Sequence, residues 1–138
     1  MATYESIGQM MQASARAAVQ SASERFGFSL DFSEGSLALL ETILTNVIAA
    51  LPDGDSNSVE RETKLWGSYF GEVVCRRWDG NWELATYPGS NFSVPAVNVR
   101  GSQLYPLVKV YRRITQGAAE DIWKYYQGIQ QKLASSHT

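Results

Sequence analysis

Two glycines four residues apart, Gly67 and Gly71, lie inside an otherwise aromatic and aliphatic stretch, LWGSYFGEVV at residues 65–74. The apolar residues around them recur at the helical spacings of three and four: Trp66, Tyr69, Phe70 and Val73. A glycine inside a helix costs about 1 kcal/mol relative to alanine, so two on one strip of a helix indicate that another backbone lies close against them. The chain therefore has to fold with a second element packed tightly on this helix.

Two further helices are predicted before this one. The first runs from about Tyr4 to Arg25 and ends at Gly27, since glycine readily adopts the left-handed conformation of a helix C-terminus. Its apolar stripe consists of Met10, Ala13, Ala17 and Val19. An extended run, FSLDF at residues 28–32, leads to the second helix.

The second predicted helix spans residues 34–51, with Ser33 as its N-cap. Its core-facing side has apolar residues at helical spacing: Leu37, Leu40, Leu44, Val47, Ile48 and Leu51. A polar loop at residues 52–57 ends it. The helix with the two glycines then begins near Ser58, whose hydroxyl group is the predicted cap.

Beyond Arg77 the apolar pattern changes from a helical period to a period of two. The Asp79-Gly80 pair between Trp78 and Trp82 predicts a turn, and a second turn at residues 88–91 separates two extended stretches. Pro106 suits the first position of a helix that ends before Gly117. The apolar side of that helix consists of Leu107, Val110, Tyr111 and Ile114.

A last helix is predicted from about Ala118 to Leu133, with one apolar face: Ile122, Tyr125 or Tyr126, Ile129 and Leu133. The order of elements predicts an α+β fold of four to five helices packed with a small antiparallel sheet of two or three strands. We expect one compact domain over residues 1–138, with an N-terminal helix within residues 1–27 and a frayed tail at 134–138.

Cysteine and histidine, which bind transition metals and take part in nucleophilic catalysis, are scarce in this chain. The chain has one cysteine, Cys75, and one histidine, His137, so we expect no disulfide, no structural metal site and no cofactor. Serine and cysteine nucleophiles lack a histidine partner unless the tail folds back. The first twenty residues do not resemble a secretory signal, and no stretch approaches the ~20 apolar residues that span a bilayer. We therefore expect a cytoplasmic protein that does not enter a membrane.

Glu72 is the one acidic residue within the aromatic stretch. Apolar surroundings raise the pKa of a carboxyl group, so Glu72 could serve as the general acid of a small hydrolase. No carboxylate, histidine or metal partner for it is evident in the sequence. We favour a structural role, in which Glu72 pairs with Arg76 at i+4 or caps a nearby backbone amide.

Charge divides the chain into two parts. Residues 1–62 hold nine acidic and three basic groups, a net charge of −6, whereas residues 63–138 hold five acidic and nine basic groups, a net charge of +4. The second part has a basic group interleaved with aromatic residues: Arg76, Arg77, Arg100, Lys109, Arg112 and Arg113. It could bind an anionic ligand or nucleic acid, but a pI of about 5.4 argues against nucleic acid. We favour a solvated face with local salt bridges.

The acidic group of the first part surrounds the polar loop: Asp53, Asp55, Glu60 and Glu62. A calcium loop that began at Asp53 would have Ser58 where the EF-hand requires glycine and Lys64 where it requires glutamate, so we expect no calcium site. What remains is an exposed anionic loop, which is either simply solvated or docks a basic partner.

Three segments resemble a group of small uncharacterised bacterial domains over residues 28–128. These segments are LDFSEGSL at 30–37, GxYxGEV at 67–73 and YPxxKV at 105–110, with a tryptophan-rich hairpin before the last and a tyrosine-rich helix after it. Some proteins of this group are regarded as immunity proteins that neutralise toxins. The resemblance implies an interaction protein and no catalytic residues.

Together these features favour a non-enzymatic protein-binding module, most concretely an immunity or antitoxin-like protein. Its partner-binding residues would be Asp53, Asp55, Glu60 and Glu62, and its partner a basic toxin domain, because complementary charge speeds capture. Two alternatives stay open. One is a binder of a small anionic ligand or nucleic acid through Arg76, Arg77, Arg112 and Arg113; the other is a small hydrolase centred on Glu72.

Overall fold

The computed structural model describes residues 6–52 and 55–135, and within them the fold is α+β, as predicted. It contains five α-helices: α1 (Ile7–Ser21), α2 (Ser36–Ala50), α3 (Ser56–Trp78), α4 (Pro106–Gln116) and α5 (Ile122–Ser135). A π-helical turn (Ala22–Phe26) extends α1, and a 3-10 turn (Ala118–Glu120) precedes α5. The three strands are β1 (Asn81–Thr86), β2 (Ser93–Val99) and β3 (Ser102–Leu104).

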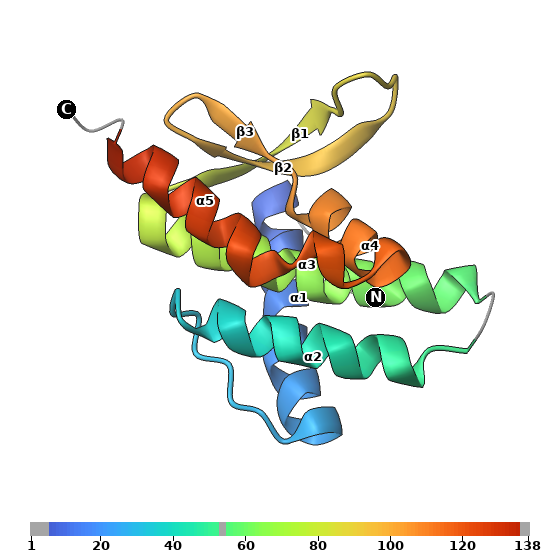
Figure 1. Cartoon of the computed structure of the whole chain (residues 1–138). Coiled ribbons are helices and arrows are strands. Elements are labelled where there is room, and N and C mark those ends of the chain that lie inside the picture. Colours follow the sequence, from blue (N-terminus) through green and yellow to red (C-terminus); the bar gives the residue numbers. More distant parts are fainter. Residues whose placement is uncertain (1–5, 53–54, 136–138) are drawn as a thin grey trace.

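The 23-residue helix α3 runs through the middle of the molecule (Figure 1). Its most extensive contacts are with α1 and α4, whereas α2 packs mainly on α5. The antiparallel sheet, in the order β1-β2-β3, lies at one side of the helices. All five helices and β2 contribute buried side chains to one core. Because α3 is buried along most of its second half, it determines how the other elements are spaced.

Neighbouring elements approach α3 closely at both of its glycines. The predicted backbone neighbour is confirmed at Gly67, whereas the neighbour of Gly71 is a side chain. A Cβ atom at position 67 would lie 2.8 Å from the Cα atom of Leu107, so the backbone of α4 does pass against the helix. At position 71 a Cβ atom would lie 2.1 Å from the Trp82 ring and 3.1 Å from Pro106 Cγ. The close neighbour of Gly71 is thus an indole ring from β1 rather than a backbone.

The helix N-termini differ from the sequence prediction by a few residues. The N-cap of α2 is Gly35 and not the predicted Ser33, since the helix begins at Ser36. The Ser33 hydroxyl lies just before the helix and accepts a hydrogen bond from the Ser36 amide at 3.2 Å. Asp55, not Ser58, is the N-cap of α3: its carboxylate accepts from the Ser58 amide at 3.1 Å and from the Ser58 hydroxyl at 2.7 Å. A carboxylate is at least as good a cap as a hydroxyl, which explains why the helix begins earlier.

The predicted apolar stripe of α1 is wrong by about one residue. The buried side chains of this segment are Met11, Ala15, Ala18 and Ala22. They face α3, which α1 contacts closely. Because α1 is rich in small residues on every side, its sequence distinguishes poorly between adjacent faces. Gly27, with φ 73°, ends the π-helical turn after α1, as expected.

The Asp79-Gly80 pair does not form the hairpin turn that the sequence predicted. Trp78 is still helical, and Asp79 ends α3 in the left-handed conformation with φ 56°. The hairpin turn lies at the second predicted position, between β1 and β2. On either side of it, Thr86 of β1 pairs with Ser93 of β2. Asp-Gly suits a helix C-terminus as well as a hairpin, since both need a left-handed residue.

Helix α4 follows the prediction closely, whereas α5 begins at Ile122, four residues after the predicted start, and Ala118–Glu120 form a 3-10 turn before it. Pro106 is at the start of α4 and Gly117 follows its end. In α5, Tyr126 is the buried tyrosine, whereas Tyr125 is 37% exposed. The helix continues to Ser135, so residues 134 and 135 are helical and not part of a frayed tail. Residues 136–138, with His137, lie outside the described part of the chain.

We expect Gly71→Ala to lower the free energy of unfolding by roughly 1–3 kcal/mol, because its Cβ atom would overlap the Trp82 ring. Gly128→Ala is the matched control: Gly128 is exposed in α5, and a Cβ atom there meets nothing within 4 Å. The control should raise stability by about 0.5–1 kcal/mol. Urea denaturation measures both. Equal effects of the two substitutions would show that Gly71 is not sterically constrained.

Candidate functional site

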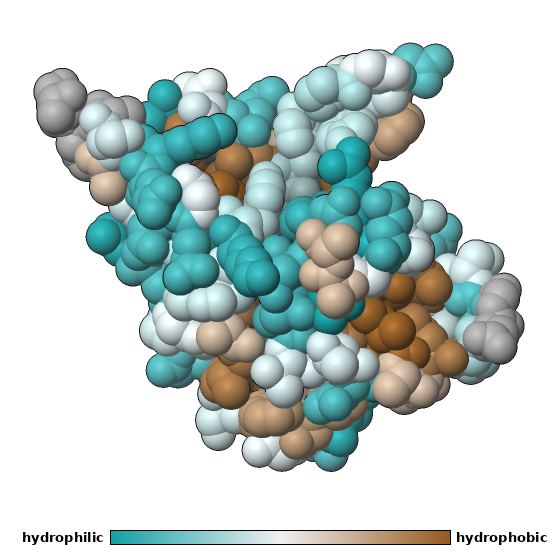
Figure 2. All heavy atoms as spheres, in the orientation of Figure 1, coloured by the Kyte–Doolittle hydropathy of each residue, from teal (hydrophilic) through white to brown (hydrophobic). Residues whose placement is uncertain are grey.

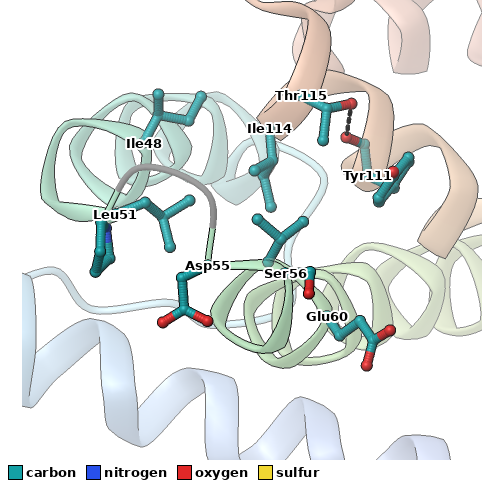
Figure 3. Close-up of a pocket in the computed structure, with 10 residues that line it drawn as sticks. Ile48, Leu51, Asp55, Ser56, Glu60, Tyr111, Ile114 and Thr115 are labelled. Atoms are coloured by element: carbon teal, nitrogen blue, oxygen red, sulfur yellow. Dashed lines mark hydrogen bonds between the residues drawn. The ribbon is translucent and has the colours of Figure 1, made fainter.

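A hollow of about 540 Å³ lies among the C-terminal end of α2, the N-terminal half of α3 and the outer side of α4. We call it the α2–α4 groove. Its apolar lining includes Ile48 and Leu51 from α2, Val59 from α3, and Tyr111 and Ile114 from α4. Figure 3 shows the side chains of Leu51 and Ile114 directed into the space between the helices. Three helices thus form a concave apolar surface.

The apolar side chains of the groove are incompletely covered. Tyr111 is 47% exposed, and Ile48, Leu51 and Val59 are half-buried. The space-filling view shows apolar surface in the same region, between α4 and the ends of α2 and α3 (Figure 2). Ile48 and Leu51 were predicted to face the core with Leu44 and Val47. Both do pack against the core, but they are only half-buried and also line the groove.

Two carboxylates stand at the border of the groove, those of Asp55 and Glu60. The hydrogen bonds from Ser58 lower the pKa of Asp55, so this carboxyl group keeps its charge. Glu60 is exposed and forms no ion pair with any residue in the described ranges 6–52 and 55–135. Both carboxylates point away from the apolar interior in Figure 3. The border is therefore anionic while the lining is apolar.

The other two predicted acidic contacts do not belong to this border. Glu62 is buried, with 7% of its surface exposed. Its carboxylate pairs with Arg25 at 2.6 Å and accepts from the Trp66 indole at 3.4 Å. The expectation that Glu62 is on an exposed acidic surface is wrong, because this glutamate joins α3 to the turn after α1. Asp53 lies outside the described residues.

The predicted arginine group does not form one site. Arg113 is 4% exposed and pairs with Glu41 at 2.8 Å, and the same carboxylate accepts from the Ile122 amide at 3.0 Å. This arrangement ties α4, α2 and the start of α5 together. Arg112, the preceding residue, points to the other side of α4 and donates to the Tyr87 hydroxyl at 2.7 Å.

Arg76 and Arg77, at the C-terminal end of α3, also have intramolecular partners. The Arg76 guanidinium lies 3.7 Å from the centre of the Phe32 ring. Arg77 pairs with Glu34 at 2.9 Å. The sequence favoured local salt bridges for this group, and Arg76, Arg77 and Arg113 each form one. Arg112 is the member of the four that forms none with a described residue.

Glu72 is 5% exposed and makes two polar contacts. It accepts a hydrogen bond from the Trp82 indole at 3.1 Å and pairs with Arg76 at 3.5 Å. The predicted i+4 partner is confirmed. The Trp82 contact was not predicted. The one signal that could have suggested it is a tryptophan near the start of the strand that follows the helix. Both contacts suit a carboxylate that holds β1 against α3.

In the described ranges, residues 6–52 and 55–135, no three histidine, cysteine or acidic side chains lie close enough together to hold a metal ion. In the same ranges, no helix combines the length and the apolar character that a bilayer span requires.

No protein-family model and no curated protein matches the sequence of this chain. A crystal structure from Bacteroides thetaiotaomicron VPI-5482 has a similar fold, with a TM-score of 0.63 and 12% sequence identity over 86% of this chain. The match spans 42% of that protein, which is less than half its length. At this identity the likeness concerns the fold alone, and it lends no support to an immunity or antitoxin role.

Cys75 should react slowly with iodoacetamide at pH 8. Burial, together with the nearby charge of Glu72, raises the pKa of its thiol to about 12. The reactive thiolate is then roughly 10³-fold scarcer than for an ordinary cysteine of pKa about 8.5. Alkylation followed by mass spectrometry should be slow in buffer and fast in denaturant. Equal rates in the two conditions would contradict this environment for Cys75.

Proposed function

We propose that this chain is a non-enzymatic protein-binding module and that the α2–α4 groove is its contact surface. The observation that supports this most directly is the combination, in one hollow, of half-buried aliphatic side chains, an exposed tyrosine and a border of carboxylates. The groove is formed by three helices that are anchored in the core, so it is preorganised for a partner.

The apolar lining supplies the main driving force in this proposal. Protein contact surfaces are enriched in tyrosine at their centres, and a few such residues carry most of the binding free energy. Tyr111 projects from α4 and is 47% exposed, while Ile48, Leu51 and Val59 surround the space beside it. A partner side chain that enters the groove would remove all of these groups from water.

The carboxylates at the border define the charge of the partner. Asp55 and Glu60 would attract a basic surface, which accelerates association and disfavours acidic competitors. A basic effector such as a toxin domain is one partner that this charge pattern suits. The proposal concerns the surface itself, whichever basic protein occupies it.

The two alternatives have less support than the groove. A hydrolase centred on Glu72 would need an accessible carboxylate, whereas the contacts with Trp82 and Arg76 account for its position. A nucleic-acid site would need several arginines on one face, whereas Arg76, Arg77 and Arg113 are paired with carboxylates of this chain.

The test is partner capture from the native host, followed by affinity measurement with the purified partner. Tyr111→Ala should weaken binding by about 10–100-fold, as removal of a central aromatic contact does. Glu60→Lys should slow association mainly at low salt. Two control variants lie outside the groove: Leu84→Ala, an exposed apolar residue of β1, and Glu24→Lys, an exposed acidic residue.

The proposal requires both groove variants to fold and both controls to bind like the parent protein. If Tyr111→Ala and Glu60→Lys bind the partner with unchanged affinity and rate, the contact surface lies elsewhere.

A further inference from the structure

A second hollow, of about 400 Å³, shares Tyr111 with the α2–α4 groove and is otherwise lined by different residues. We call it the hairpin pocket, because the hairpin of β1 and β2 forms one of its walls. Val94, Leu107 and Val108 give it an apolar floor, and Tyr87 and Phe92 line it from either side of the hairpin turn. Its volume is in the range of small-molecule sites, which are mostly apolar with a few polar groups.

The aromatic wall of the hairpin pocket is preassembled. The rings of Tyr87 and Phe92 are stacked, with centroids 6.0 Å apart and planes at 17°. Tyr105 supports Tyr87 in an edge-on arrangement at 5.1 Å. Phe92 nevertheless remains 53% exposed. A planar aromatic ligand would cover this open side of Phe92 in an offset stack, which aromatic pairs favour.

One cation borders this apolar space, the guanidinium of Arg112. Its hydrogen bond with the Tyr87 hydroxyl, at 2.7 Å, holds it beside the aromatic wall. No carboxylate of residues 6–52 or 55–135 lies within ion-pair distance of it. Glu120 pairs with Lys109, which lowers the pKa of its carboxyl group, and the Arg112 charge lowers this pKa further. A guanidinium has five N–H donors, so Arg112 retains donors for an anion.

A polar atom beside the pocket also lacks a partner. Thr63, on α3, lines the pocket, and its Oγ1 atom is shielded from solvent without a hydrogen bond to any described residue. Buried hydroxyl groups are almost always bonded. Threonine has two accessible χ1 rotamers in a helix, so a rotation can present the hydroxyl group to a ligand.

We propose that the hairpin pocket binds a small aromatic carboxylate. The aromatic ring lies on the apolar floor against Phe92, and the carboxylate pairs with Arg112, whose planar fork of donors matches a carboxylate in geometry. This site is separate from the proposed protein contact. Tyr111 lines both hollows, but Phe92 and Arg112 line the hairpin pocket alone.

The experiment compares 2-naphthoate with its uncharged analogue 2-naphthamide on the whole chain. Amide chemical shifts in 15N-labelled protein give both the location and the dissociation constant. We expect 2-naphthoate to shift the amides of Tyr87, Phe92, Val108 and Arg112, and to bind more tightly than the amide. Charge-assisted hydrogen bonds contribute enough for a difference of about tenfold or more.

Two substitutions separate the ring from the charge. Arg112→Gln should weaken 2-naphthoate about tenfold or more and leave 2-naphthamide unchanged, whereas Phe92→Ala should weaken both ligands. The matched controls are Arg16→Gln, another exposed arginine, and Leu84→Ala, another exposed apolar residue; neither lines the pocket. All four positions are exposed, so the variants should fold.

The proposal is overturned if neither ligand binds at millimolar concentration, if the shifts centre on Ile48 and Leu51 instead, or if Arg112→Gln affects the two ligands equally. Partner capture and its response to Glu60→Lys are measured separately from ligand binding, so the ligand site and the protein contact can fail independently.

Discussion

The structure depends on the close approach of α4 and the Trp82 ring to one strip of α3. Without side chains at positions 67 and 71, Leu107 and Trp82 reach the surface of the helix itself. This contact positions α4 and the start of β1 relative to α3, and Glu72 reinforces it through its hydrogen bond from the Trp82 indole. Both hollows are lined by residues of α4 and share Tyr111, so their shapes depend on how this contact places α4.

Ion pairs fasten the remaining segments to this frame. Glu62 joins α3 to Arg25, and Glu41 joins α2 to Arg113 on α4. Both glutamates are largely shielded, so removal of one partner would leave a poorly solvated charge. These pairs also explain the charge of the surface. They neutralise residues that the sequence suggests for recognition, and they leave Glu60 and Arg112 without ion-pair partners in the described ranges, each beside an apolar hollow.

Local patterns in the sequence predicted most of the fold. Helical spacing identified α2, and Pro106 and Gly117 marked the ends of α4, because these signals act within a few residues. The Asp79-Gly80 pair was misread since a helix end and a hairpin turn share the left-handed conformation. Only part of the candidate site was predicted. The charge pattern identified Asp55 and Glu60. Tyr111 lies about fifty residues later in the chain and reaches the groove only because α4 packs beside α3, and no local pattern in the sequence reveals this packing.

Native-state hydrogen exchange tests most directly whether α3 and its glycine strip hold the molecule together. Amides near the centre of a structure exchange only when the whole protein unfolds, whereas weakly held segments open locally. We predict that amides of residues 66–74 exchange with the free energy of global unfolding and that amides of the turn at residues 88–91 exchange far faster. Faster exchange at residues 66–74 than in the middle of α2, through local opening, would contradict the account.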